Sequence, residues 1–289
     1  MKSDRAENFR GAGTMEPRTF DRRKGDDMRK CVCIFVGLLA LMLMYNEFPT
    51  QLKSSAYASE HGLTQQQLDY YSDSFDKFQE GIWVKAEPII PKKVQKKNFK
   101  NADIAIEDGS LKITTKKGGF STGVIVFKDS LRGDFDLQID CDMNFLEGEV
   151  NIDQRLFFVV RNVGVSFKKS NRNTFFLVKL RKSNKSYLET NYAKYGEFHF
   201  GKRIELKDFK GTLRFMRKDK KIHLLFKLNQ ETEWTKMSTF PCTRKDFKVI
   251  IGLNNFIGKR TSINADVSTS VYIDNFKINS AQSIIEEDI

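Results

Sequence analysis

The sequence has little proline, cysteine, histidine or tryptophan for its length: its 289 residues include 5 Pro, 4 Cys, 3 His and 2 Trp. A chain this long can bury a large core, which excludes a disulfide-stapled miniprotein. Two of the cysteines, Cys31 and Cys33, lie in an apolar run, and only Cys141 and Cys242 follow it. The cysteines and histidines form no C-x-x-C or H-x-x-x-H spacing, so the sequence excludes a structural zinc site.

Motifs of several ligand-binding classes are also missing. The sequence contains no complete Walker-type glycine loop and no H-E-x-x-H, which excludes P-loop nucleotide binding and the common zinc peptidases. The formal net charge is +12, but the lysines occur in short bursts, mostly where strands are expected to end. Such lysines protect strand edges and keep a protein soluble. Since no nucleic-acid recognition motif accompanies them, we expect no nucleic-acid partner.

Phenylalanine, by contrast, is abundant, with 25 residues, and 8 tyrosines accompany it. Aromatic residues are enriched in strands, so this composition favours an all-β chain. Charged residues make up 30% of the chain and apolar residues 40%. These fractions fit neither a polytopic membrane protein nor a disordered chain, and the bulk is expected to be globular.

The N-terminal part contains an apolar run, CVCIFVGLLALMLMY, at residues 31–45. As a helix it would span about 22 Å, short of the roughly 30 Å hydrocarbon core of a bilayer, so it matches the apolar region of a signal peptide better than a full membrane span. If Met28 is the initiator, cleavage after the Ala56-Tyr57-Ala58 triplet would leave Ser59 as the new N-terminus. If Met1 is the start, the basic flank of residues 1–30 favours an uncleaved anchor with a cytoplasmic N-terminus.

Both alternatives place the rest of the chain outside the cytoplasm, either periplasmic or secreted, or anchored by residues 31–45. Contact with a membrane is expected only through this segment. The predicted organisation is therefore an export segment at residues 1–58, a linker or short helix at 59–72, one folded body at 73–280 and an acidic tail at 281–289.

From Asp73 onward, stretches with a two-residue apolar period recur every eight to twelve residues. Clusters of Gly, Asn, Asp or Lys separate them, and no dozen residues keep a helical period, which predicts an antiparallel two-sheet sandwich. Residues 88–100 carry two prolines and five lysines and are expected to form an exposed loop.

Individual strands can be assigned faces. In the strand from Asp134 to Phe145, one face is apolar and is expected to include Cys141, while the other is acidic and wet. RLFFVVR at 155–161 and TFFLVKLR at 174–181 are apolar on both faces, as central strands covered on both sides would be. GTLRFMRK at 211–218 and KIHLLFK at 221–227 flank a turn and predict a hairpin, with His223 on the non-core face.

Three segments together resemble a known superfamily: GDFDLQIDCDM at 133–143, GTLRFMRKDKKIHLLFKLNQETEW at 211–234 and VYIDNFKIN near the end. They are similar to the concanavalin A-like lectin/glucanase superfamily, and within it to exported bacterial domains related to laminin G modules. The resemblance covers roughly residues 73–280 and implies a jelly-roll sandwich. In the resembling domains a Trp after the long hairpin packs into the core, so we expect Trp83 and Trp234 to have structural roles.

The glucanases of this superfamily place Glu, Asp and Glu at alternate positions of one strand. Here Asp140 and Asp142 lie about 7 Å apart along their strand, whereas retaining hydrolysis needs two carboxyls about 5.5 Å apart. The E-x-D-x-E pattern is absent and no Trp lies beside the pair. We therefore expect a solvated strand face, and a glycoside hydrolase that uses Asp140 and Asp142 is the alternative. The resemblance to laminin G-like domains also makes Asp140, Asp142, Glu147 and Glu149 candidate calcium ligands, and no other cofactor is indicated.

A sugar-binding surface needs planar aromatic rings with hydrogen-bonding neighbours. The densest such stretch contains the candidate ligand-binding residues Tyr187, Tyr192, Tyr195 and His199. The favoured function is thus an exported, non-catalytic protein that binds carbohydrate or another cell-surface polymer. A hydrolase with a non-standard carboxylate pair and a structural envelope protein remain open.

The two cysteines of the folded body are predicted to be free thiols. Cys141 belongs to an apolar strand face, where a small, weakly polar side chain packs well. A disulfide would need the Cα atoms of Cys141 and Cys242 within about 7 Å, and nothing in the sequence pairs their segments.

Overall fold

The computed structural model describes residues 62–86, 99–144, 153–163, 174–182, 185–194, 197–242, 246–256 and 267–286. The predicted export segment and the cleavage site before Ser59 lie outside these residues. No helix in the described part of the chain is long and apolar enough to cross a membrane.

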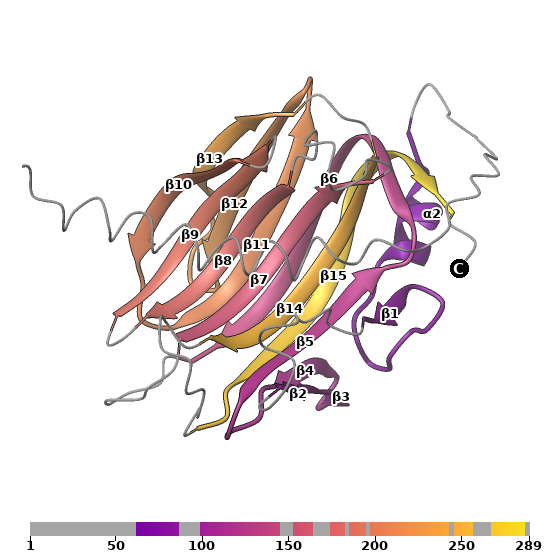
Figure 1. Ribbon diagram of the computed structural model, residues 1–289. Coiled ribbons are helices and arrows are strands. Elements are labelled where there is room, and N and C mark those ends of the chain that lie inside the picture. Colours follow the sequence, from indigo (N-terminus) through magenta and orange to yellow (C-terminus); the bar gives the residue numbers. More distant parts are fainter. Residues whose placement is uncertain are drawn as a thin grey trace, which may run out of the picture.

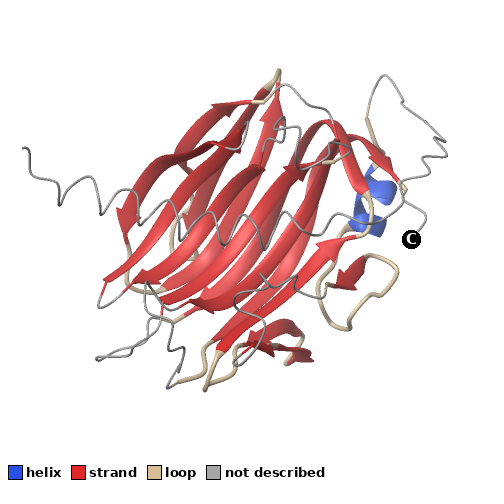
Figure 2. Cartoon of the chain, in the orientation of Figure 1, coloured by secondary structure: helices blue, strands red, loops and turns tan. Residues whose placement is uncertain are grey.

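Almost all of the described chain is strand, as Figure 2 shows. A single short helix, α2 (Gln65–Tyr71), comes first among the described elements. The strands are β1 (Trp83–Lys85), β2 (Phe99–Asn101), β3 (Asp103–Glu107), β4 (Ser110–Thr114), β5 (Phe120–Phe127), β6 (Ser130–Met143), β7 (Asp153–Asn162), β8 (Thr174–Lys182), β9 (Lys185–Lys194), β10 (Glu197–Glu205), β11 (Phe209–Lys218), β12 (Lys221–Leu228), β13 (Thr235–Pro241), β14 (Asp246–Phe256) and β15 (Ser270–Ile285).

The strands form two layers (Figure 1). The front sheet has the order β10-β9-β8-β7-β14-β5, and β1 and β2 pair with β5. The back sheet has the order β13-β12-β11-β6-β15-β4-β3. The layers are joined where β14 meets β6 at Asp246 and Phe247. All pairs are antiparallel except β2 with β5, so the prediction of an antiparallel sandwich is confirmed for the described residues.

The main core lies between the two sheets. Its contribution from β6 is the apolar face that the sequence predicts, with every member at most 4% exposed: Phe135, Leu137, Ile139, Cys141 and Met143. The rings of Phe158 on β7 and Phe215 on β11 lie 4.9 Å apart between centroids and join the two layers. Strand alternation thus places one face of each sheet in the core.

A second apolar cluster covers the outer face of the front sheet. Its members are all at most 6% exposed: Val124, Phe157, Val159, Phe176, Val178, Leu180, Ala193 and Ile250. Strands β7 and β8 are therefore buried on both faces, and β8 lies between β7 and β9. This confirms the interpretation of their two-sided apolar sequences.

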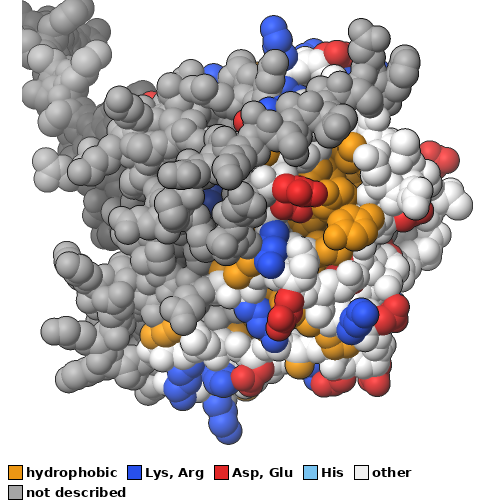
Figure 3. Space-filling view, turned by 90° about the vertical axis from the view of Figure 1, so that its right-hand side faces the viewer, with side chains coloured by type: hydrophobic (Ala, Val, Ile, Leu, Met, Phe, Trp, Pro, Cys, Tyr) orange, Lys and Arg blue, Asp and Glu red, His pale blue; other side chains and the backbone are white. Residues whose placement is uncertain are grey.

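The segment before β1 packs against the last strand. Helix α2 begins with a capping box formed by Thr64 and Gln67, and Leu68 is buried, which confirms a short helix here. Trp83 is 1% exposed, and its indole Nε1 donates to Asp73 at 2.9 Å. The structural role expected of Trp83 is thus confirmed. Figure 3 looks onto this side of the molecule, where apolar side chains gather in a patch among charged ones.

The predicted loop at residues 88–100 ends earlier than expected. Phe99 and Lys100 belong to β2, which pairs in parallel with β5. The remainder, residues 88–98, lies outside the described residues. The loop prediction was wrong at Phe99 and Lys100. It relied on the lysines of this segment, but a short edge strand tolerates lysines as well.

Cys141 and Cys242 form no disulfide with each other, as predicted, and Cys141 is buried as expected. Cys242 is buried as well, which the sequence did not predict. Burial, and then the neighbouring carboxylates Asp140 and Asp142, raise the pKa of the Cys141 thiol. A thiol in such surroundings packs like a small apolar side chain and is chemically inert.

Candidate functional site

The predicted carboxylate pair lies on the outer face of the back sheet. Strand β6 runs between β11 and β15, and its outward face carries Asp140 and Asp142. Thr212 Oγ1 donates to Asp140 Oδ1 at 2.6 Å, and Asn275 Nδ2 donates to Asp140 Oδ2 at 3.0 Å. Lys210 Nζ lies 2.9 Å from Asp142 Oδ2. Both carboxylates are thus held by neighbouring strands.

Further along the same face, a chain of polar contacts ends on an indole ring. Arg214 Nε donates to Asp136 Oδ1 at 2.7 Å, and a second guanidinium nitrogen donates to the other carboxylate oxygen. Asn279 Nδ2 also donates to Asp136, at 3.2 Å. The guanidinium carbon of Arg214 lies 4.8 Å from the centre of the Trp234 ring, and Lys227 Nζ lies 5.3 Å from it.

Trp234 therefore does not pack in the core, and that part of the sequence prediction is wrong. Arg214 and Lys227 alternate with the core residues of the hairpin, so they face outward. Their cations attract the indole ring onto the outer surface of the sheet. The prediction relied on the position of the Trp after the hairpin and not on the outward-facing cations beside it.

The predicted aromatic residues fall on two different faces. Tyr187 lies beneath the guanidinium of Arg203, whose carbon is 4.9 Å from the ring centre. Tyr192 is stacked on His199 with ring centroids 4.5 Å apart and planes at 15°. Since Tyr187 and Tyr192 are five residues apart in β9, alternation sends them to opposite faces. The structure brings Tyr192 and His199 together, separates Tyr187 from them, and does not describe Tyr195.

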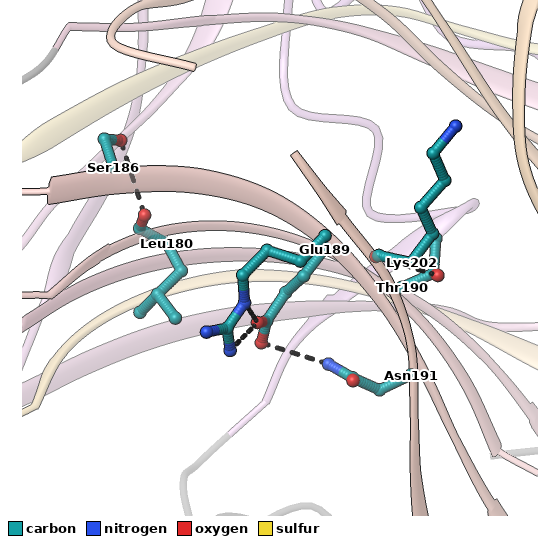
Figure 4. A network of polar contacts seen from close by, with 7 residues as sticks. Leu180, Ser186, Glu189, Thr190, Asn191 and Lys202 are labelled. Atoms are coloured by element: carbon teal, nitrogen blue, oxygen red, sulfur yellow. Dashed lines mark hydrogen bonds and ion pairs between the residues drawn. The ribbon is translucent and has the colours of Figure 1, made fainter. Parts of the chain in front are cut away.

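Sequence reasoning missed a buried polar cluster at the edge of the front sheet (Figure 4). Glu189 is 2% exposed and accepts hydrogen bonds from Arg203 Nε at 2.8 Å and from Asn191 Nδ2 at 3.1 Å. Glu189 lies opposite Val178 of β8, so the cluster borders the second apolar cluster. The signal was a Glu and an Asn at alternate positions of a strand, with an Arg in the next strand.

One hydrolase-like string is present in an unsuitable structural context. Residues 119–123 spell G-x-S-x-G, but Ser121 lies within β5 and is fully buried. The nucleophile of such a motif needs a sharp turn between a strand and a helix, where its hydroxyl is exposed. The string is therefore part of the sheet, and its backbone N–H at Ser121 donates to Asn255 at 2.6 Å.

The described residues contain no group of three or more His, Cys, Asp or Glu side chains arranged to hold a metal ion. Two of the four predicted calcium ligands, Glu147 and Glu149, lie outside the described residues. The calcium prediction therefore stays a prediction.

Carboxylates at successive alternate positions occur on one described strand, β6. The outward positions of β8, at the centre of the front sheet, are instead apolar: Phe176, Val178 and Leu180. Within the described residues, a pair of carboxylates on an exposed strand face therefore occurs on the back sheet and not on the front sheet.

Several solved structures share this arrangement of strands. A laminarinase from Flavobacterium sp. UMI-01 matches with a TM-score of 0.51 at 12% identity, over 72% of this chain and 98% of the laminarinase. The mixed linkage glucan PUL GH16 protein of Bacteroides ovatus, in complex with a G4G4G3G product, gives 0.51 at 16% identity, over 72% and 99%. A LamA variant from Z. galactanivorans, in complex with laminaritriose and laminaritetraose, gives 0.52 at 10% identity, over 72% and 97%.

The chain therefore shares the two-sheet sandwich fold of these solved structures. This likeness rests on structure, because no protein-family model and no curated protein sequence matches the chain. At these identities it shows the fold alone, and function has to be argued from the surfaces of this sandwich.

Proposed function

We propose that this chain is an exported, non-catalytic protein that binds carbohydrate or another cell-surface polymer. One observation carries the non-catalytic part: each oxygen of Asp140 accepts a hydrogen bond from a neighbouring strand, and Lys210 pairs with Asp142. A hydrolytic pair must exchange protons with the sugar and with water, which such structural bonding opposes. The chain shares its fold with glucan-acting proteins, which favours carbohydrate over other polymers as the ligand.

The first candidate ligand contact is the Tyr192–His199 stack. The side chain of His199 is 41% exposed, and Tyr192 is also tilted against Phe240 at 4.5 Å between ring centroids. A ring held in this way loses little conformational entropy when a sugar stacks on its rim. Tyr195 is proposed as a further contact of this stack, and Tyr187 as a separate contact on the opposite face of β9.

A glycan panel tests this function directly. Wild-type protein is expected to bind at least one polysaccharide in affinity electrophoresis, and Tyr192→Ala and His199→Ala are expected to weaken that binding. Tyr70→Ala is a matched control, because Tyr70 is 72% exposed on α2 and distant in the fold from β9 and β10. A folded protein that binds no polysaccharide of a broad panel would overturn the proposal.

The second candidate is a glycoside hydrolase that uses Asp140 and Asp142, favoured by the fold likeness to glucan-acting proteins. Release of reducing ends from a polysaccharide, abolished by Asp140→Asn or Asp142→Asn, would place this candidate first. If binding and cleavage are both absent and the protein captures an envelope partner, a structural role replaces both.

Export is proposed from the apolar run at residues 31–45. N-terminal analysis of the secreted fraction should give a chain that begins at Ser59. Recovery of full-length protein in the membrane fraction alone would replace cleavage by anchoring.

A further inference from the structure

The outer face of the back sheet carries a second candidate binding surface, apart from the Tyr192–His199 stack, and this surface includes the ring of Trp234. Strand β12 turns Lys221, His223 and Lys227 outward, because the residues that alternate with this face, Ile222, Leu224 and Phe226, are buried in the core. In β13, Lys236 lies opposite the outward Leu225. Trp234 precedes β13 and lies against Lys227. We call this set, Lys221, His223, Lys227, Trp234 and Lys236, the Trp234 strip.

The positive charge of the Trp234 strip is not neutralised locally. Elsewhere on the outer face of this sheet, cations are paired: Lys210 with Asp142, Arg214 with Asp136 and Lys112 with Glu107. Within the described part of the chain, no carboxylate lies within ion-pair distance of Lys221, Lys227 or Lys236. Burial, and then the charges of Lys236 and Lys221, lower the pKa of His223, which is consistent with a positive potential there.

The indole of Trp234 is held in place before any ligand binds. Arg214, fixed by two hydrogen bonds to Asp136, supports the ring, and Lys227 contacts it as well. A positioned aromatic ring loses little entropy on binding and offers a flat apolar surface.

We propose that the Trp234 strip binds an acidic polysaccharide, whose anionic groups pair with Lys221, Lys227 and Lys236 while one sugar ring stacks on Trp234. This inference rests on the proposed carbohydrate-binding function and names a ligand class and a surface for it. Lys221 and Lys227 are six residues apart in one strand, about 20 Å, so the surface suits a polymer and not a single sugar.

The strip suits a polysaccharide better than a single-stranded nucleic acid. Sequence-independent binding of single strands combines a basic groove with several aromatic side chains on which successive bases stack. The strip offers one large aromatic ring, Trp234, and one imidazole, His223, which is hydrogen-bonded to Thr239. The anionic group can be a carboxylate or a sulfate ester, since a lysine ammonium pairs with either as a point charge.

The test measures binding of the full mature chain to four probes: laminarin as a neutral glucan, polygalacturonate, dextran sulfate and single-stranded poly(dT). We expect at least one acidic polysaccharide to bind more tightly than laminarin and poly(dT), and the binding to weaken as salt is added. Tighter binding of polygalacturonate identifies a uronate as the partner, and tighter binding of dextran sulfate identifies a sulfate.

Matched triple variants locate the surface. Lys221→Gln/Lys227→Gln/Lys236→Gln should weaken acidic-polysaccharide binding on the order of tenfold, since each surface ion pair contributes modestly. The control Lys77→Gln/Lys117→Gln/Lys185→Gln removes the same charge from exposed lysines outside the strip and should leave the affinity within about twofold. Trp234→Ala should also weaken binding and Trp234→Phe should retain most of it, with thermal unfolding of each variant as the check on folding.

Each contrary result has a distinct meaning. Binding of laminarin without binding of acidic polymers overturns this inference and leaves the proposed function standing. Binding of no polysaccharide overturns both. Equal losses in the two triple variants, or equally tight binding of poly(dT), show attraction by net charge alone and overturn the inference.

Discussion

The outer faces of the two sheets differ in polarity although both are built from strands with the same two-residue period. On the front sheet the outward residues are apolar and buried, as in Phe157, Phe176 and Val178. On the back sheet they are charged and bonded across strands, as in Asp136, Arg214 and Asp140. The outer face of the front sheet therefore contributes to stability, whereas the outer face of the back sheet is open to a ligand.

The largest expected effect comes from placing a charge on each face. Val178→Asp puts a carboxylate among apolar side chains at a position 5% exposed, and should lower the free energy of unfolding by about 4 kcal/mol. Leu225→Asp makes a similar change on the outer face of the back sheet, opposite Lys236, and should cost about 1 kcal/mol or less. Urea denaturation measures both. Equal losses would mean that the two faces do not differ in burial as described.

The second prediction concerns a cation buried in the front sheet. Lys179 is 2% exposed, and its ammonium donates to the Ser186 hydroxyl and to the carbonyls of Leu206 at 2.7 Å and Lys207 at 3.0 Å. Burial lowers the pKa of Lys179 to about 8, and Asp208 opposes the shift.

In the unfolded chain this lysine titrates near its ordinary pKa of 10.5, so between pH 8 and 10.5 the unfolded state binds more protons. The free energy of unfolding should therefore rise with pH across this window, by at most about 3 kcal/mol. Denaturant unfolding at several pH values measures the slope, and Lys179→Met should remove it. A slope that persists in Lys179→Met would assign the effect to another group.

Strand alternation explains how much of the fold could be predicted. The core face of β6 and the two-sided burial of β8 follow from the two-residue period alone, because each side chain's face is fixed by its position along the strand. The hairpin of β11 and β12 follows from two such strands around a short turn. These features are local in sequence.

The site features that could not be predicted depend on pairing between strands. Glu189 and Arg203 are 14 residues apart and meet because β9 and β10 pair with a register shift near Arg203. Trp234 meets Arg214 only because β11, β12 and β13 lie side by side. The separation of Tyr187 from Tyr192 was predictable in principle, because residues five apart in one strand face opposite sides.

The third prediction sharpens the contrast within the back sheet. Arg214 and Asp136 have side chains 22% and 12% exposed, whereas Lys210 in its pair with Asp142 is 68% exposed. Arg214→Ala should lower the free energy of unfolding by about 2 kcal/mol. The reason is that the nearly buried carboxylate of Asp136 would keep only the neutral amide of Asn279 as a donor. Lys210→Ala should cost less than about 0.5 kcal/mol. Trp234 fluorescence should change in the first variant and not in the second.

The smallest expected effect is a titration shift at His223. Its Nδ1 lies 2.8 Å from Thr239 Oγ1, and burial, followed by Lys236 and Lys221, lowers its pKa below the ordinary 6.5. The folded state therefore binds fewer protons than the unfolded state just below pH 6.5, and stability should decline slightly as the pH falls through that window. In Lys221→Gln/Lys236→Gln the pKa of His223, followed by NMR, should rise toward 6.5 without reaching it, since the burial contribution remains. Lys210→Gln is the control, because that lysine is paired with Asp142 and should leave the titration in place. An unchanged His223 pKa in the double variant would show that these lysines set no positive potential over the strip, and would weaken the case for an anionic ligand there.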